Sequence, residues 1–92
     1  MTLIIRKLGR PNCQPCNAMS NYLKLLKPQI TELGATYSEH DVMVERALLE
    51  KYEIQSVPVL IFERNGVEVA RLNGLAAPEE IIDVLKHAKE VR

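Results

Sequence analysis

The sequence predicts one α/β domain over residues 1–92, in the order strand, helix, strand, helix, two strands, helix. Three observations support this fold class. Short apolar runs bounded by glycine and proline alternate with stretches of helical periodicity. An Asn-Gly pair separates the last two strand-like runs, as in a tight hairpin. The length allows one modest core, and 47% apolar with 26% charged residues is an ordinary globular composition.

The first half of the chain is predicted to form a strand, a long helix and an edge strand. Residues 2–8 are rich in aliphatic side chains, and their apolar centre indicates burial on both faces of a sheet. A helix follows, capped by Asn12 and ended by Gly34. Its apolar face, at spacings of three and four, consists of Met19, Leu23, Leu26, Ile30 and Leu33. Pro28 predicts a kink or a break in this helix. Residues 35–41 follow as the second strand.

The second half is predicted to form a helix, a hairpin and a final helix. Residues 42–53 carry apolar side chains at four-residue steps, namely Val44, Leu48 and Tyr52. Residues 57–62 form a compact apolar strand, and Asn65-Gly66 suits a type I′ turn into a strand over residues 67–72. Pro78 begins the last helix, which has acids in its first turn and bases in its last.

Short connections and right-handed crossovers limit how these elements are arranged. We expect a four-stranded mixed sheet in the order 2-1-3-4, with the fourth strand antiparallel and helices on both faces. The first strand is then central. Open α/β sheets carry their sites at the carboxyl ends of such strands. The residues that follow the first strand are therefore the first place to look for chemistry.

Two cysteines, Cys13 and Cys16, lie at that place and are the only cysteines of the chain. At the start of a helix, free backbone N–H groups and the helix dipole favour an anion, so a thiol there loses its proton more easily. We expect a Cys13 thiolate to attack a disulfide and Cys16, one turn on, to resolve the mixed disulfide. Pro15 suits the first turn, where its missing N–H costs nothing.

Other interpretations of these residues exist. The two cysteines could instead be inert thiols, or they could form half of a zinc site. Because no second C-x-x-C is present and the two histidines lie far away in the sequence, we expect no bound metal. Arg10, Lys7 and Arg6 are near enough in sequence to lower the pKa of Cys13. Equally, these three cations fit a solvated surface.

Composition excludes several classes of function. Twelve basic residues balance twelve acidic ones and there is no Trp, so neither nucleic acid nor a membrane surface is an expected partner. No apolar run reaches membrane-spanning length, and no signal peptide is expected. Two close cysteines in such a chain are typical of redox or metal chemistry in the cytoplasm rather than of a structural disulfide.

The motifs together resemble the thioredoxin family over essentially the whole chain. C-Q-P-C, with Gln14 and Pro15 between the cysteines, is similar to the C-G-P-C of the family. Residues 54–62 resemble its cis-proline strand, and Gly74 resembles the glycine that borders its peptide groove. The resemblance implies a cis bond between Val57 and Pro58, packed against the cysteines, with Val57, Pro58 and Gly74 shaping the groove that binds substrate.

Two positions depart from the family pattern. Asn12 stands where thioredoxins usually have Trp, and Lys7 stands where they have a buried Asp that serves the second cysteine. Glutaredoxins are similarly short and share the proline signature. They bind glutathione partly through a Gly-Gly pair and an acid after the fourth strand, whereas Gly74 is followed by Leu75 and two alanines. The departure at Lys7 leaves the proton acceptor of Cys16 open.

The resemblance implies a small protein disulfide oxidoreductase that takes part in electron transport and cell redox homeostasis. We expect a monomer that needs no bound cofactor beyond its own Cys13–Cys16 disulfide and is reduced by thioredoxin reductase or a similar flavoprotein. Asn12, Gln14, Pro15 and Arg10 would support the cysteines. Three alternatives stay open: a glutathione-dependent glutaredoxin, a binding subunit with an incidental dithiol, and a metal or iron–sulfur cluster bridged by two chains.

Overall fold

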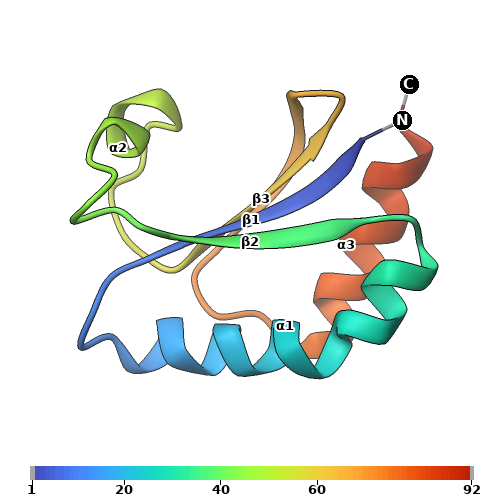
Figure 1. The fold of residues 1–92 in the computed structure, drawn as a ribbon, viewed down its shortest axis with the longest axis horizontal. Helices are drawn as coiled ribbons and strands as arrows, with labels where there is room; N and C mark the ends of the chain where they lie inside the picture. Colours follow the sequence, from blue (N-terminus) through green and yellow to red (C-terminus); the bar gives the residue numbers. More distant parts are fainter. Residues whose placement is uncertain (1, 92) are drawn as a thin grey trace.

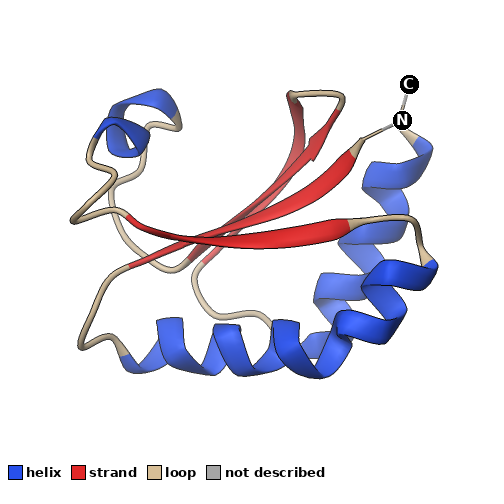
Figure 2. Ribbon diagram, viewed as in Figure 1, coloured by secondary structure: helices blue, strands red, loops and turns tan. Residues whose placement is uncertain are grey.

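The computed structural model describes residues 2–91, and these form a four-stranded sheet with helices on both faces (Figures 1 and 2). The elements follow one another as the sequence predicts: β1 (Leu3–Gly9), α1 (Gln14–Glu32), β2 (Thr36–Asp41), α2 (Ala47–Lys51), β3 (Val59–Arg64), β4 (Val67–Asn73) and α3 (Pro78–Glu90).

The sheet order is β2-β1-β3-β4, as predicted, with β4 antiparallel to β3. β1 and β2 are parallel, and a right-handed crossover through α1 explains that pair. β3 runs antiparallel to β1, a direction that does not follow from the rule for right-handed crossovers. The sheet is therefore mixed, and β1 lies in its interior.

Two apolar cores lie on opposite faces of the sheet. The larger core contains Leu3, Ile5, Leu60 and Phe62 from the strands and the buried faces of α1 and α3, which pack side by side (Figure 1). The smaller core lies under α2. Its buried members are Leu8, Val42, Tyr52, Val59 and Ile61. Because successive residues of β1 alternate between these cores, the side chain of each residue on the strand has a defined face.

Helix α1 contains the predicted apolar face but is not broken at Pro28. The helix continues through Pro28 to Glu32, and its last turns, drawn in teal, rise away from the line of the earlier ones (Figure 1). Pro28 itself is exposed, so the carbonyl left without its usual partner can be hydrated. The helix ends as expected, with Gly34 at φ +80°.

The second helix is much shorter than predicted, because Asp41 holds the chain in a turn first. The backbone carbonyl of Asp41 accepts the N–H groups of Val44 and Glu45, and its side chain accepts the N–H of Met43 at 2.8 Å. The helix begins only at Ala47, and Val44 is 78% exposed rather than buried. The four-residue spacing from Val44 was therefore misleading.

The hairpin forms at the predicted residues. Asn65 and Gly66 both have positive φ, 54° and 82°, as a type I′ turn requires. The strand before it begins at Val59, two residues later than predicted, so Val57 and Pro58 lie in the loop that leads into the sheet. Across the described part of the chain, no helix is both long enough and apolar enough to cross a membrane.

Candidate active site

The loop between β1 and α1 brings the two cysteines to the carboxyl end of β1. Cys13 is the N-cap of α1, and its Sγ accepts the backbone N–H of Cys16 at 3.2 Å. The prediction that Asn12 caps the helix is wrong. Asn12 is exposed and has φ +57°, a left-handed conformation that Asn tolerates, and this turn delivers Cys13 to the capping position.

Cys13 and Cys16 are joined by a disulfide. The Cys13 residue is 5% exposed and the Cys16 residue is 0% exposed, so the first sulfur is nearer the surface and the second belongs to the interior. Cys13 is the N-cap, next to the free N–H groups of the first turn of α1, whereas Cys16 is the third residue of that turn and is fully buried. The two thiols of the reduced protein therefore occupy different electrostatic environments.

The predicted supporting residues lie around this disulfide on the surface. Gln14 and Pro15 are exposed in the first turn of α1. Arg10 is also exposed, and its Nη1 donates to the carbonyl of Pro11 at 3.3 Å. The structure does not bring the Arg10 guanidinium into a hydrogen bond with either sulfur, so its effect on Cys13 stays a prediction.

The predicted groove residues come from two loops that meet. The Val57–Pro58 peptide bond is cis, and Pro58 is buried while Val57 is half-buried. The N–H of Gly74 donates to the carbonyl of Pro58 at 2.8 Å, which joins the loop before β3 to the loop after β4. Gly74 has φ +84°, and a Cβ there would meet no atom within 4 Å, so Gly74 serves the turn rather than a close contact.

A hollow of about 350 Å³ lies beside the loop that leads into β3. Its apolar lining suits the side chains of an extended peptide better than a charged ligand. Arg10 and Val57 are the predicted site residues that line it. The others are Val42, Met43, Leu49, Ile54, Gln55 and Ser56.

A buried charge near the cysteines escaped the sequence analysis. Lys7 is 7% exposed and points to the α1 face of the sheet, where its Nζ donates to Ser20 Oγ at 2.8 Å and contacts Glu39 Oε1 at 3.3 Å. The signal was available, because Lys7 is two residues after Ile5 and so shares its buried face. The alternative of a solvated surface is wrong for Lys7.

Arg6, the neighbouring cation, points to the opposite face and does not serve the cysteines. It pairs with the buried carboxylate of Glu63, which also accepts the Tyr52 hydroxyl at 2.7 Å. Burial raises the pKa of Glu63, but the hydrogen bonds from Arg6 and Tyr52 outweigh it, so this pKa is lowered overall. Burial and Glu63 together raise the pKa of Tyr52 to about 12.

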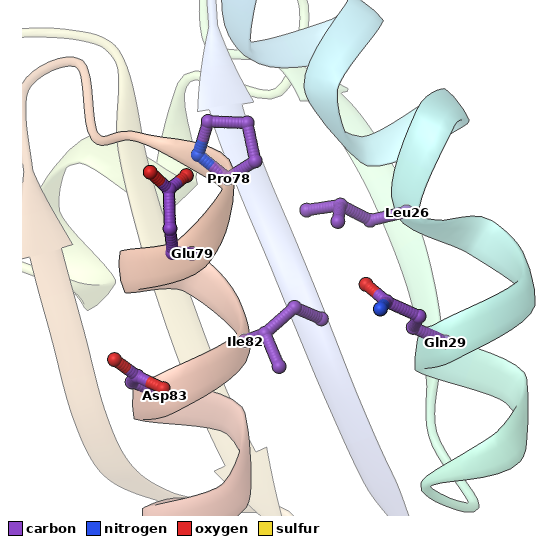
Figure 3. Close-up of a pocket in the computed structure, with 6 residues that line it drawn as sticks. All are labelled: Leu26, Gln29, Pro78, Glu79, Ile82 and Asp83. Carbon is purple, nitrogen blue, oxygen red and sulfur yellow. The ribbon is translucent and has the colours of Figure 1, made fainter.

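A second hollow, between α1 and α3, contains none of the predicted site residues. Leu26 and Ile82 project into it from facing helices, with Gln29, Pro78, Glu79 and Asp83 around them (Figure 3). It presents two carboxylates but no cysteine, histidine or cation. Among residues 2–91, no group of three or more histidine, cysteine or acidic side chains is placed to hold a metal ion.

Comparison with known proteins identifies the family of this chain. The family model for a thioredoxin-like domain matches residues 4–89. The chain belongs to the thioredoxin family. Among curated members, it is 32% identical over 84 residues to the SPbeta prophage-derived thioredoxin-like protein YosR of Bacillus subtilis. That alignment covers 90% of this chain and 95% of YosR.

Human glutaredoxin-3 is another relative, 30% identical over 87 residues. The alignment covers 95% of this chain, which spans only 25% of glutaredoxin-3. Among solved structures, N21Q mutant thioredoxin from Halobacterium salinarum superposes with a TM-score of 0.86 at 22% identity, covering 98% of this chain and 77% of that one. The thioredoxin fold and the Cys13–Cys16 disulfide make the chain a thiol–disulfide oxidoreductase in the general sense.

Proposed function

We propose that this chain reduces disulfide bonds in other proteins, with Cys13 as the nucleophile and Cys16 as the resolving thiol. The observation that carries the proposal is the asymmetry of the pair. Cys13 caps α1 nearer the surface, whereas Cys16 is fully buried one turn further on. The helix N-terminus favours a thiolate at Cys13, and the hollow beside Val57 offers an apolar surface on which substrate can bind.

The reaction proceeds in two exchanges. The Cys13 thiolate attacks one sulfur of the substrate disulfide; that S–S bond breaks, a mixed disulfide forms, and the other substrate sulfur leaves as a thiolate that takes a proton from water. Cys16 loses its proton to water and attacks the Cys13 sulfur. The Cys13–Cys16 disulfide forms and the second substrate thiolate leaves and is protonated, so two electrons have passed to the substrate.

Trapping tests this division of labour. A Cys16→Ser variant is expected to hold substrate proteins as stable mixed disulfides at Cys13, since the resolving attack is lost, and Cys13→Ser is expected to hold almost none. In the reduced wild type, limiting iodoacetamide near neutral pH should label Cys13 well ahead of Cys16. Equal trapping by the two variants, or preferred labelling of Cys16, would contradict the proposal.

We further propose a flavoprotein of the thioredoxin reductase type as the electron donor. Glutathione carries two carboxylates and an ammonium, which require charged partners at fixed places. The residues after Gly74 are Leu75, Ala76 and Ala77, and Leu75 is 51% exposed. This loop offers an apolar surface and no charge. The proposal includes a single domain that works as a cytoplasmic monomer without a bound cofactor.

The similarity to human glutaredoxin-3 favours one competing function, reduction by glutathione. Steady-state NADPH consumption separates the two donors, with thioredoxin reductase in one series and glutathione plus glutathione reductase in the other. Faster turnover with glutathione would replace the proposal with the glutaredoxin function. A variant with both cysteines changed to serine tests the remaining alternative, because a pure binding subunit would keep its function.

A further inference from the structure

Gly9 opens a space in which a lysine and the resolving cysteine come together. A Cβ at Gly9 would stand 3.0 Å from Lys7 Nζ and 3.3 Å from Cys16 Cβ. Both atoms therefore border the same small volume at the end of β1. Gly9 has no side chain to fill it, and both side chains are buried. An ammonium group lies beside Cys16 in the interior of the protein.

The counter-charge of Lys7 is the carboxylate of Glu39, which is more exposed to solvent than Lys7 itself. Glu39 is paired with Lys7 across β1 and β2, and it also accepts a hydrogen bond from Ser20. Partial burial raises the pKa of Glu39, but the hydrogen bonds from Ser20 and Lys7 lower it overall, so Glu39 is a carboxylate at neutral pH. Its side chain is 43% exposed, whereas that of Lys7 is 9% exposed. Water screens the anion more than the cation, so the field at Cys16 is positive.

We propose that Lys7 is a positioning residue of the resolving step, whose buried ammonium stabilises the thiolate of Cys16. The proposal rests on the proposed function and adds to it how Cys16 becomes reactive. Burial alone disfavours the thiolate of Cys16, and a nearby cation offsets this. When Cys16 gives its proton to water, the negative charge forms on the sulfur attached to Cβ, and this Cβ borders the same space as Lys7 Nζ. Attack on the Cys13 sulfur then follows as described above.

The other charges around Cys16 are exposed, half-buried or on the opposite face of the sheet. β3 presents Leu60 and Phe62 to this face. α3 buries only apolar side chains, and its first-turn acids, Glu79 and Glu80, are exposed. On α1 itself, Lys24 is exposed and acts on Glu39 from outside. Arg6 lies on the opposite face with Glu63. On β2, Asp41 is half-buried and lies opposite Gly9 in the strand register, on the face of Lys7, and its carboxylate accepts the N–H of Met43. Cys13 carries the first thiolate.

The test is a pH titration of the reduced protein that measures the pKa of Cys16. The titration is monitored by NMR of cysteine labelled at Cβ. Lys7→Met keeps the length and apolar stem of the side chain and removes its charge, and is expected to raise the pKa of Cys16 by about one unit. Glu39→Gln leaves Lys7 without its counter-charge and is expected to lower this pKa. Lys24→Met is the matched control, since it makes the same change on the exposed face of α1 and should leave Cys16 nearly unmoved.

The outcomes separate this proposal from the proposed function, because the titration uses no substrate. A rise of less than about half a unit in Lys7→Met would overturn the role of Lys7. So would a rise in Glu39→Gln, or an equal rise in Lys24→Met. If Lys7→Met fails to fold, Glu39→Gln decides alone by the direction of its shift. A protein with the expected titration that reduces no protein disulfide would overturn only the proposed function.

Discussion

The Tyr52 hydroxyl should contribute measurably to stability through its hydrogen bond to Glu63. Tyr52→Phe removes one oxygen from a site where Tyr52 is 6% exposed and Glu63 is 5% exposed. The carboxylate keeps its ion pair with Arg6 but loses a 2.7 Å hydrogen bond. Hydrogen bonds to charged groups contribute about 1.5–3 kcal/mol, and little solvent is present to replace this one. We expect the free energy of unfolding to fall by about 2 kcal/mol at neutral pH.

The pH dependence provides a second, independent check. The pKa of Glu63 is lowered in the folded protein from its ordinary 4.5, so the stability it contributes is present above that value and is lost as the pH falls through the folded pKa. The difference between wild type and Tyr52→Phe should shrink at acid pH accordingly. The pKa of Tyr52 is raised from 10.0 to about 12, so its contribution is present below pH 10 and is lost between 10 and 12.

Urea unfolding followed by circular dichroism measures these quantities, since the chain has no Trp for fluorescence. The oxidised form of each protein should be compared, so that the disulfide is the same throughout. Glu63→Gln and the double variant complete a cycle that isolates the pair. A loss below about 0.5 kcal/mol in Tyr52→Phe would refute the reasoning, and so would a loss that is the same at acid and neutral pH.

Three further changes test the packing around the sheet. Gly9→Ala should lower the thermal midpoint of the oxidised protein, because its Cβ would crowd both Lys7 Nζ and Cys16 Cβ; a higher midpoint would mean that this space is free. Gly66→Ala forces an alanine to φ +82° and should cost about 1–2 kcal/mol in urea unfolding, whereas an unchanged value would exclude strain in the hairpin. Phe62→Ala empties the centre of the larger core and should cost about 3–5 kcal/mol; a loss under about 1 kcal/mol would show that the core can collapse around the gap.

The sequence predicted the fold well where one local rule acted alone. Asn65-Gly66 needed only the type I′ rule, and both residues have positive φ as expected. Pro78, followed by Glu79 and Glu80, predicted the first residue of α3 correctly. The apolar spacing of α1 named its buried face, because a long amphipathic helix leaves little choice of orientation.

Prediction failed where a side chain competed with the pattern. Asp41 has both a carbonyl and a carboxylate within reach of the next residues, and its hydrogen bonds delayed α2 to Ala47. Asn12 has the better side chain for a cap, yet Cys13 holds that position because the turn before it is left-handed. Neither outcome follows from spacing or propensity, since both depend on which of two hydrogen bonds forms.

The candidate site was predictable in part. Cys13 and Cys16 were found from their spacing and their place after a strand, and Gly74 and Pro58 from the resemblance. Lys7 was named, but its burial against Cys16 was not anticipated. This proximity needs the chain to turn in the loop between β1 and α1, which brings Lys7 Nζ and Cys16 Cβ to the same space beside Gly9. The alternation of side chains along β1 places Lys7 and Arg6 on opposite faces of the sheet, but it does not show which of the two lies near Cys16.

The sulfur that caps α1 also makes the backbone of Cys16 an internal reporter. The N–H of Cys16 donates to the Sγ of Cys13 at 3.2 Å. An amide proton senses the charge and oxidation state of the atom that accepts it. The resonance of this proton therefore differs between a disulfide, a thiolate and a mixed disulfide at Cys13. Spectroscopy can follow the Cys13 sulfur through a single backbone amide, in the unmodified protein and without any attached dye.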